Sequence, residues 1–335
     1  MILLLGSTDD AFTTFVAEWL YFYQKEYVVL CSNDERAKII SINIPEEEIL
    51  IQKGEKVFNL LDAESVFSRR RGFSMQSIHV NEKMKNDVFL EANDSYHVQH
   101  RKEELRYLID YIHFKLKEKA KIIIGGFNKN DVNKLEILEL ARSCGLDIPE
   151  SYIFTKKSDA LNLIKSKEKG NKHIITKPLS QGVYRILPEI GYYNYVERLT
   201  ASKLKKIPDT FFPSLFQIEI KKKYELRIFY LNGICYAMAI FSQGNKNTEV
   251  DFRKPNLDKP DNRKVPYNLP ADISIKINNL MNRIGLNTGS IDMIVAQDDS
   301  YVFLEVNPVG QIPMTSVPCN YYLEQLVAKQ LINYY

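Results

Sequence analysis

The residue types best suited to chemistry lie near the carboxyl end of the chain, on two predicted strands. The stretches GSIDMIVA and YVFLEVNP flank the turn QDDS and are typical of an antiparallel pair. If Ala296 pairs with Tyr301, Asp292 lies opposite Glu305, and strand alternation puts Asn307 on the same face. Opposed carboxylates repel unless a cation lies between them. Two carboxylates and an amide oxygen suit Mg²⁺, with a nucleotide as the expected co-ligand.

An ordinary explanation stays open for this polar face, namely a solvated surface with one protonated acid or a nearby lysine. Two basic residues upstream pose a similar choice. Lys177 ends the strand HIITK, where its ammonium can contact a phosphate or reach solvent. Arg227 lies inside the strand ELRIFYL, and a guanidinium there needs an anionic partner.

A third basic feature is the run Arg69 to Arg71 in SVFSRRRGF, which stands between two phenylalanines. Such a run suits an acidic peptide or a nucleic acid. A solvated basic loop is the favoured interpretation, because nothing else in its surroundings points to a ligand.

The composition sets limits on the class of protein. The chain has 335 residues, 45% of them hydrophobic, and a net charge of +3 from 45 basic and 42 acidic residues. This balance does not indicate a nucleic-acid binder. The four cysteines form no CxxC pair, which favours free thiols in a reducing cytoplasm. No apolar run approaches the roughly 20 residues that span a bilayer, so we expect a cytoplasmic protein without a membrane partner.

The elements that must position these residues change character along the chain. MILLLG, YVVLCS and KIIIGG read as buried strands separated by helical segments, which predicts a parallel α/β layer. No GxGxxG follows the first strand, so dinucleotide binding is not supported. Strands dominate from Ser214 onward, and ELRIFYL-NG-ICYAMAIF predicts a hairpin with Asn232 and Gly233 as its turn.

These motifs, taken in order, resemble an ATP-grasp ligase. The resemblance rests on strand-end Lys177, on FQIEI and KKKYELRIFYLNG, on DFRKPN, and on GSIDMIV followed by FLEVNPVGQ. Within that superfamily the chain looks most like the graspetide or microviridin-type ligases that macrocyclise ribosomal peptides, in particular the grasp-with-spasm maturases. The resemblance implies an ATP-grasp fold of three parts: an N-terminal parallel α/β domain (1–126), a small central α+β domain (127–213) and a C-terminal α+β domain (214–335).

The resemblance also implies roles for individual residues. Asp292, Glu305 and Asn307 match the metal ligands, and Lys177 matches a contact to the nucleotide phosphates. The adenine hinge matches Gln217, Ile218, Glu219 and Ile220, while Lys222 and Glu225 fall where the family has a lysine and an acid near the nucleotide. Arg227 and Arg253 match two catalytic arginines near the γ-phosphate and the acyl phosphate.

The implied reaction uses ATP and Mg²⁺ as cofactors and a precursor peptide, leader plus core, as substrate. A Glu or Asp side chain would become an acyl phosphate, which a Ser/Thr hydroxyl or a Lys amine displaces to close a lactone or lactam. These ligases are commonly homodimers. Two alternatives stay open: an ATP-grasp ligase that adds free amino acids to a carboxylate, like the glutathione-forming members, and a nucleotide-binding regulatory module without chemistry.

Overall fold

The computed structural model describes residues 1–74, 77–78, 95–127, 129, 131–168, 170, 172–180, 184–186, 191–193, 195–243 and 262–333. The chain forms two compact units. Unit 1 comprises Met1–Asp131, Gly285–Thr288 and Pro308–Tyr335, and unit 2 comprises Val132–Ile284 and Gly289–Asn307. The last segment of the chain therefore packs with the first, whereas the three-part division at 126/127 and 213/214 stays a prediction.

Unit 1 is built on a four-stranded parallel sheet in the order β2-β1-β6-β7. The strands are β1 (Ile2–Gly6), β2 (Tyr27–Cys31), β6 (Ser65–Ser68) and β7 (Ile122–Gly125). β1 and β6 are buried along their whole length and β2 and β7 in part, because helices cover both faces of the sheet. The predicted parallel α/β layer is confirmed for the described residues.

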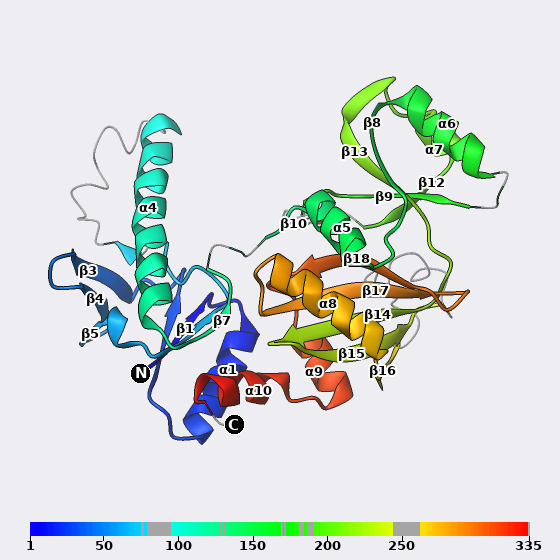
Figure 1. Cartoon of the computed structure of the whole chain (residues 1–335). Coiled ribbons are helices and arrows are strands. Elements are labelled where there is room, and N and C mark those ends of the chain that lie inside the picture. Colours follow the sequence, from blue (N-terminus) through cyan, green and yellow to red (C-terminus); the bar gives the residue numbers. More distant parts are fainter. Residues whose placement is uncertain are drawn as a thin grey trace. The chain divides into compact units, whose positions relative to one another are not determined.

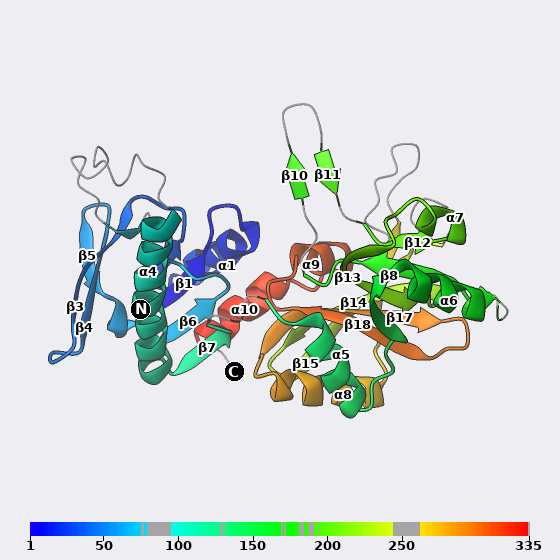
Figure 2. The same cartoon turned by 90° about the horizontal axis from the view of Figure 1, so that it is seen from above.

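The two faces of this sheet are covered by helices from distant parts of the chain (Figures 1 and 2). On one face, α4 (Ser95–Lys119) packs its apolar side on Leu3 and Leu5. On the other, α1 (Ala11–Phe22) and α10 (Leu323–Leu331) pack against each other, and α10 also contacts β6 and β7. Alternation along β1 thus divides its leucines between the two layers.

Two features of unit 1 escaped the sequence analysis. An antiparallel meander of β3 (Ala37–Asn43), β4 (Glu48–Lys53) and β5 (Lys56–Asn59), followed by the short 3₁₀ turn η1 (Leu60–Asp62), lies between β2 and β6 in the chain. The stretch before the arginine run is β6, a fully buried strand. The favoured interpretation of SVFSRRRGF as a solvated loop is therefore wrong for its first half.

Unit 2 contains a five-stranded antiparallel sheet in the order β16-β15-β14-β17-β18. Its strands are β14 (Lys222–Leu231), β15 (Ile234–Phe241), β16 (Arg263–Tyr267), β17 (Thr288–Ala296) and β18 (Tyr301–Asn307). The helices α5 (Lys134–Ser143) and α8 (Ala271–Arg283) pack together on this sheet, α5 against β18 and α8 against β15 (Figure 1). This sheet carries the acidic ribbon, which is the antiparallel pair β17 and β18 with Asp292 and Glu305.

The predicted hairpin of unit 2 is confirmed. Leu231 pairs with Ile234, which leaves Asn232 and Gly233 as a two-residue turn. Both turn residues have positive φ, 45° for Asn232 and 92° for Gly233. This is the conformation that a tight hairpin requires and that Asn-Gly adopts most readily.

A second sheet of unit 2 has the order β12-β9-β13-β8. Its members are β8 (Ser151–Lys156), β9 (Ile174–Lys177), β12 (Glu197–Leu199) and β13 (Thr210–Ile218). The helices α6 (Lys157–Glu168) and α7 (Ala201–Leu204) contribute to its apolar core. A short pair, β10 (Tyr184–Ile186) and β11 (Gly191–Tyr193), branches from the same region of the chain.

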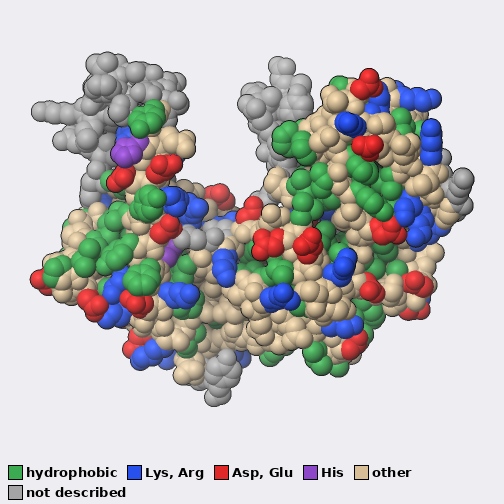
Figure 3. Space-filling view, turned by 45° about the horizontal axis from the view of Figure 1, so that its top comes forward, with side chains coloured by type: hydrophobic (Ala, Val, Ile, Leu, Met, Phe, Trp, Pro, Cys, Tyr) green, Lys and Arg blue, Asp and Glu red, His purple; other side chains and the backbone are tan. Residues whose placement is uncertain are grey.

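The remaining described helix, α9 (Pro313–Cys319), belongs to unit 1. None of the helices in the described residues is long and apolar enough to cross a membrane. On the face shown in Figure 3, basic and acidic side chains are interspersed over the coloured surface. That mixture agrees with the near balance of 45 basic and 42 acidic residues.

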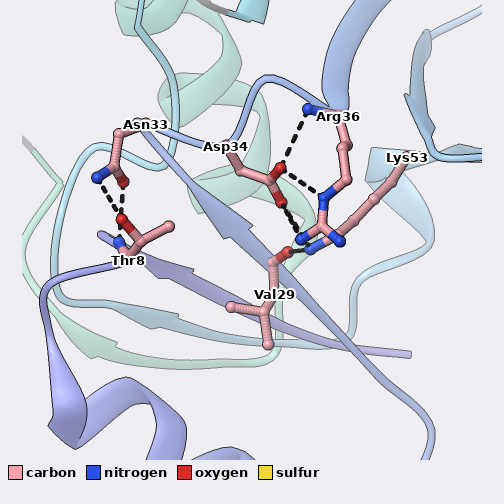
Figure 4. A network of polar contacts seen from close by, with 6 residues as sticks. All are labelled: Thr8, Val29, Asn33, Asp34, Arg36 and Lys53. Carbon is pink, nitrogen blue, oxygen red and sulfur yellow. Dashed lines mark hydrogen bonds and ion pairs between the residues drawn. The ribbon is translucent and has the colours of Figure 1, made fainter.

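A polar network fixes the turn after β2 and ties it to the meander (Figure 4). Asp34 is 7% exposed and accepts hydrogen bonds from the backbone N–H and the guanidinium of Arg36, at 2.9 to 3.2 Å. Lys53 of β4 approaches the same carboxylate at 3.5 Å and donates to the carbonyl of Val29. These contacts, the Arg36 side chain first, lower the pKa of Asp34 to about 2.

Replacing Asp34 with Asn should lower the free energy of unfolding at pH 7 by about 1 kcal/mol, a figure reduced because Arg36 is solvent-exposed. A folded-state pKa below the unfolded value of 3.8 gives stability that is present above pH 4 and is lost as the pH falls through about 2. Urea unfolding at pH 7, 5 and 3 should show the wild type approaching the variant at the lowest pH. The exposed neighbour change Glu35→Gln serves as control, and an unchanged Asp34→Asn stability at pH 7 would contradict the assignment.

Candidate functional site

The acidic ribbon of β17 and β18 has the predicted cross-strand pairing at Asp292 and Glu305. Asp292 pairs with Glu305, and Ser290 pairs with Asn307. Paired residues of an antiparallel ladder point to the same face, so Asp292, Glu305 and Asn307 share one face. Asp292 is 19% exposed and Glu305 28%, which leaves both carboxylates accessible from solvent.

The register at the other end of the ribbon differs from the prediction by one residue. Tyr301 pairs with Val295 rather than with Ala296, and the register shifts between Met293 and Asp292. Leu304 is the extra residue of this β-bulge, which re-aims the strand that follows it. The extra residue shifts the pairing by one position. Glu305 therefore lies opposite Asp292 as predicted, although the pairing next to the turn differs from the predicted one.

Protein cations already balance the two opposed carboxylates. Nη1 of Arg227, on β14, donates to both carboxylate oxygens of Asp292 at 2.7 Å. Nζ of Lys134 lies 3.2 Å from Oε2 of Glu305. The anionic partner expected for Arg227 is therefore Asp292. Repulsion between the carboxylates does not by itself require a metal, because the nearby lysine of the ordinary explanation is present as well.

Lys134 is a site residue that the sequence analysis missed. It opens α5 directly after Asn133, whose side chain caps that helix. Its ammonium also donates to the carbonyls of Pro178, at 3.3 Å, and Ser180, at 3.2 Å, in the segment that follows Lys177. In a chain with 45 basic residues, nothing but its place at a helix start marked this lysine.

The predicted hinge comprises the last two residues of β13 and the two residues that follow it. Gln217 has a buried side chain that donates to Oγ of Ser151 at 2.8 Å. The N–H of Ile218 donates to the carbonyl of Glu150, and the N–H of Glu219 to that of His173. Within the described part of the chain the N–H of Ile220 has no hydrogen-bond partner. It is therefore the hinge amide that remains available to a ligand.

Neighbouring ion pairs hold this hinge in place. The guanidinium of Arg198, on β12, makes two hydrogen bonds of 2.7 and 2.6 Å to the carboxylate of Glu219. Lys222 and Glu225 form a buried ion pair at the start of β14. The structure thus brings these two predicted residues together, next to the hinge in the chain. Arg253 lies outside the described residues.

The donor set suits a hard cation. Among the described residues there is no cluster of three or more His, Cys, Asp or Glu side chains able to hold a metal. A metal at the ribbon would therefore use the two carboxylates and the amide of Asn307, with other positions filled from outside the protein, as Mg²⁺ commonly does. The buried atoms that lack a partner within the described residues include Nε of Arg227 on β14 and Oγ of Ser290 on β17. The fit to a divalent cation rests on the oxygen donors of Asp292, Glu305 and Asn307, which share one face and whose two carboxylates are partly exposed.

Of the comparisons with known proteins, the one with solved structures identifies the fold. No family model and no curated protein match the chain. It is similar over 99% of its length to a RiPP-associated ATP-grasp ligase from Chryseobacterium gregarium, described in complex with ADP and a leader and core peptide (23% identity, 96% of that chain, TM-score 0.77). It is also similar over 99% of its length to the macrocyclase MdnC of Microcystis aeruginosa MRC, bound with precursor peptide MdnA (24% identity, 100% of that chain, TM-score 0.76).

A third similar structure is the ATP-grasp ligase PsnB, complexed with minimal precursor, Mg and ADP (16% identity, 99% of this chain and 96% of that chain, TM-score 0.73). At such identities the likeness establishes architecture. The chain has the ATP-grasp fold, as the sequence resemblance implied, and the match extends over nearly its whole length.

Replacing Arg227 with Met should destabilise the protein by about 2–4 kcal/mol, because Asp292 would then face Glu305 without its own counter-ion. Adding Asp292→Asn to that variant should recover part of the loss. Chemical denaturation of the wild type, both single variants and the double variant measures this coupling. The change Lys223→Met, at an exposed position of the same strand, is the matched control and should stay within about 0.5 kcal/mol of the wild type. A fully additive double variant would mean that the Arg227–Asp292 contact contributes nothing.

Proposed function

We propose that the protein is an ATP-dependent macrocyclase of a ribosomally made precursor peptide. The observation that carries the proposal is the shared face of Asp292, Glu305 and Asn307, flanked by Arg227 and Lys134, in an ATP-grasp fold. The peptide substrate is supported by the complexes of similar structures, which contain leader, core or precursor peptides.

ATP would lie between the hinge and the ribbon residues of unit 2. The free N–H of Ile220 and the adjoining backbone carbonyl of Glu219 offer the donor and acceptor that adenine needs. Lys222 and Glu225 adjoin this hinge in the chain. Lys177 and Lys134 supply ammonium groups for the phosphates, since Lys134 already contacts the carbonyls that follow Lys177.

Asp292, Glu305 and Asn307 would hold Mg²⁺, which neutralises charge on the phosphates of bound ATP. The two protein cations then have a second task. On binding of a metal nucleotide, Lys134 can exchange the carboxylate of Glu305 for a phosphate oxygen. Arg227, whose Nε has no partner within the described residues, can donate to the transferring phosphoryl group. Arg253 is proposed to act beside it on the acyl phosphate.

The proposed reaction balances in two steps. A Glu or Asp carboxylate oxygen of the peptide attacks the γ-phosphorus, and ADP leaves with the electron pair of the broken P–O bond. A Ser/Thr hydroxyl or Lys amine then attacks the acyl carbon, phosphate leaves, and the nucleophile loses its proton. Each ring costs one ATP and removes the elements of one water from the peptide. Activation is needed because a carboxylate is a poor electrophile at neutral pH.

The second candidate, addition of a free amino acid to a carboxylate, uses the same nucleotide residues. The full-length similarity to peptide macrocyclases favours cyclisation. The homodimer and the cytoplasmic location remain predictions, together with the three-part domain division.

The decisive experiment incubates the protein with ATP, Mg²⁺ and a short peptide encoded beside its gene that carries repeated Thr/Ser and Glu/Asp residues. We expect the peptide to lose the mass of one water per ring while an equal amount of ADP forms, as mass spectrometry and a coupled ADP assay would show. A mass gain equal to an added amino acid would support the second candidate instead. ATP binding without turnover of any peptide or amino acid would support a regulatory module.

Replacing Glu305 with Gln keeps the side chain's size but removes one proposed metal-binding carboxylate. We expect kcat to fall about 100-fold and the Mg²⁺ concentration for half-maximal rate to rise, because charge on the transferring phosphoryl group is less well stabilised. The matched control is Asp298→Asn, an exposed acid in the turn of the same ribbon. Unchanged activity and Mg²⁺ dependence in Glu305→Gln would show that the metal lies elsewhere.

A further inference from the structure

The arginine run after β6 divides into three different environments. Arg69 is 7% exposed, Arg70 is half-buried and Arg71 is exposed. The Nε of Arg69 donates to the carboxylate of Asp10, and its guanidinium lies 5.1 Å from the centre of the Phe12 ring. A buried guanidinium engaged in this way cannot serve as a docking point for an acidic substrate, as the run as a whole suggested.

The position of Arg69 is fixed from both of its ends. Its backbone N–H donates to the carbonyl of Leu5 at 3.1 Å. Gly72, three residues further on, has a φ of +74°, and a Cβ there would lie 2.6 Å from a methyl carbon of Leu5, so the turn packs directly on β1. Asp10 is equally constrained, because it caps α1 by accepting from the N–H of Phe12.

A further hydrogen bond of Arg69 reaches the segment that follows β18. Its Nη2 donates to the carbonyl of the buried Gly310 at 3.0 Å. Gly310 stands three residues after Asn307 in the chain. Little slack lies between them, because the ring of Pro308 fixes its φ and Val309 is 8% exposed.

We propose that Arg69 is a positioning residue for the metal-binding end of β18. By holding the carbonyl of Gly310, it restricts the connection Pro308–Gly310 and so limits where Asn307 can place its amide. The inference rests on the proposed function, since it assumes that Asn307 and Glu305 bind Mg²⁺. It explains why the first arginine of the run is buried and bonded to Gly310, which neither a solvated loop nor a substrate contact would account for.

The test compares two variants that differ only at Arg69, in a background where its counter-ion Asp10 has been neutralised. Asp10→Asn keeps a good helix cap and leaves Arg69 in place. Adding Arg69→Met removes the bond to Gly310 without stranding a buried carboxylate. Relative to Asp10→Asn, the double variant should need about tenfold more Mg²⁺ for half-maximal ADP binding, measured by titration calorimetry at a temperature where both are folded. Arg71→Met, at the exposed end of the run, should behave as the wild type.

Hydrogen exchange supplies the readout that does not depend on the metal. The amides of Val309 to Gln311 should exchange about tenfold faster in the double variant than in Asp10→Asn, while those of β1 stay unchanged. Faster exchange with unchanged Mg²⁺ dependence would overturn the positioning role, and so would no change in either. Should the double variant fail to fold, Arg69→Lys, which keeps the charge and loses the second donor, must show the same two effects, or the proposal is wrong. A wild type that binds no Mg²⁺ nucleotide would refute the proposed function itself, whereas the exchange data would still report on the Gly310 bond.

Discussion

The structure of the site depends on one electrostatic constraint: two carboxylates held opposite each other on adjacent strands. Asp292 and Glu305 cannot both stay ionised at short range without cations, and the protein supplies one for each. Arg227 comes from the neighbouring strand, whereas Lys134 comes from the start of a helix that packs on β18. The two cations beside the acidic ribbon are also groups of the kind that a phosphate attracts.

Parts of this design follow from local sequence rules. Asn232-Gly233 specified its hairpin because few other residue pairs adopt two consecutive positive φ angles at low cost. Three of the four strands of the parallel sheet, β1, β2 and β7, were recognisable as unbroken apolar runs. The pairing of Asp292 with Glu305 was predicted from alternation, yet the assumed turn register was wrong by one residue. A bulge at Leu304 compensated for that error, and no local signal announces a bulge.

Other features depend on contacts between distant segments and were not predictable from the sequence. Ser65–Ser68 has only four residues and is followed directly by arginines, so its burial became evident only from its place between two other strands. In the sequence, nothing distinguishes Arg69 from the two arginines that follow it. Only the fold brings Asp10 and Gly310 into contact with its side chain. Lys134 lies far in sequence from Glu305, and only the packing of α5 on β18 brings them together.

The order in which the chain is synthesised has a consequence for the first unit. The face of the parallel sheet that α10 covers stays open until Leu323–Leu331 have left the ribosome, because no earlier helix besides α1 occupies that layer among the described residues. The second unit, by contrast, has all its strands by Asn307. The amino-terminal sheet can therefore be fully covered only at the end of synthesis, whereas the strands of the second unit are complete earlier.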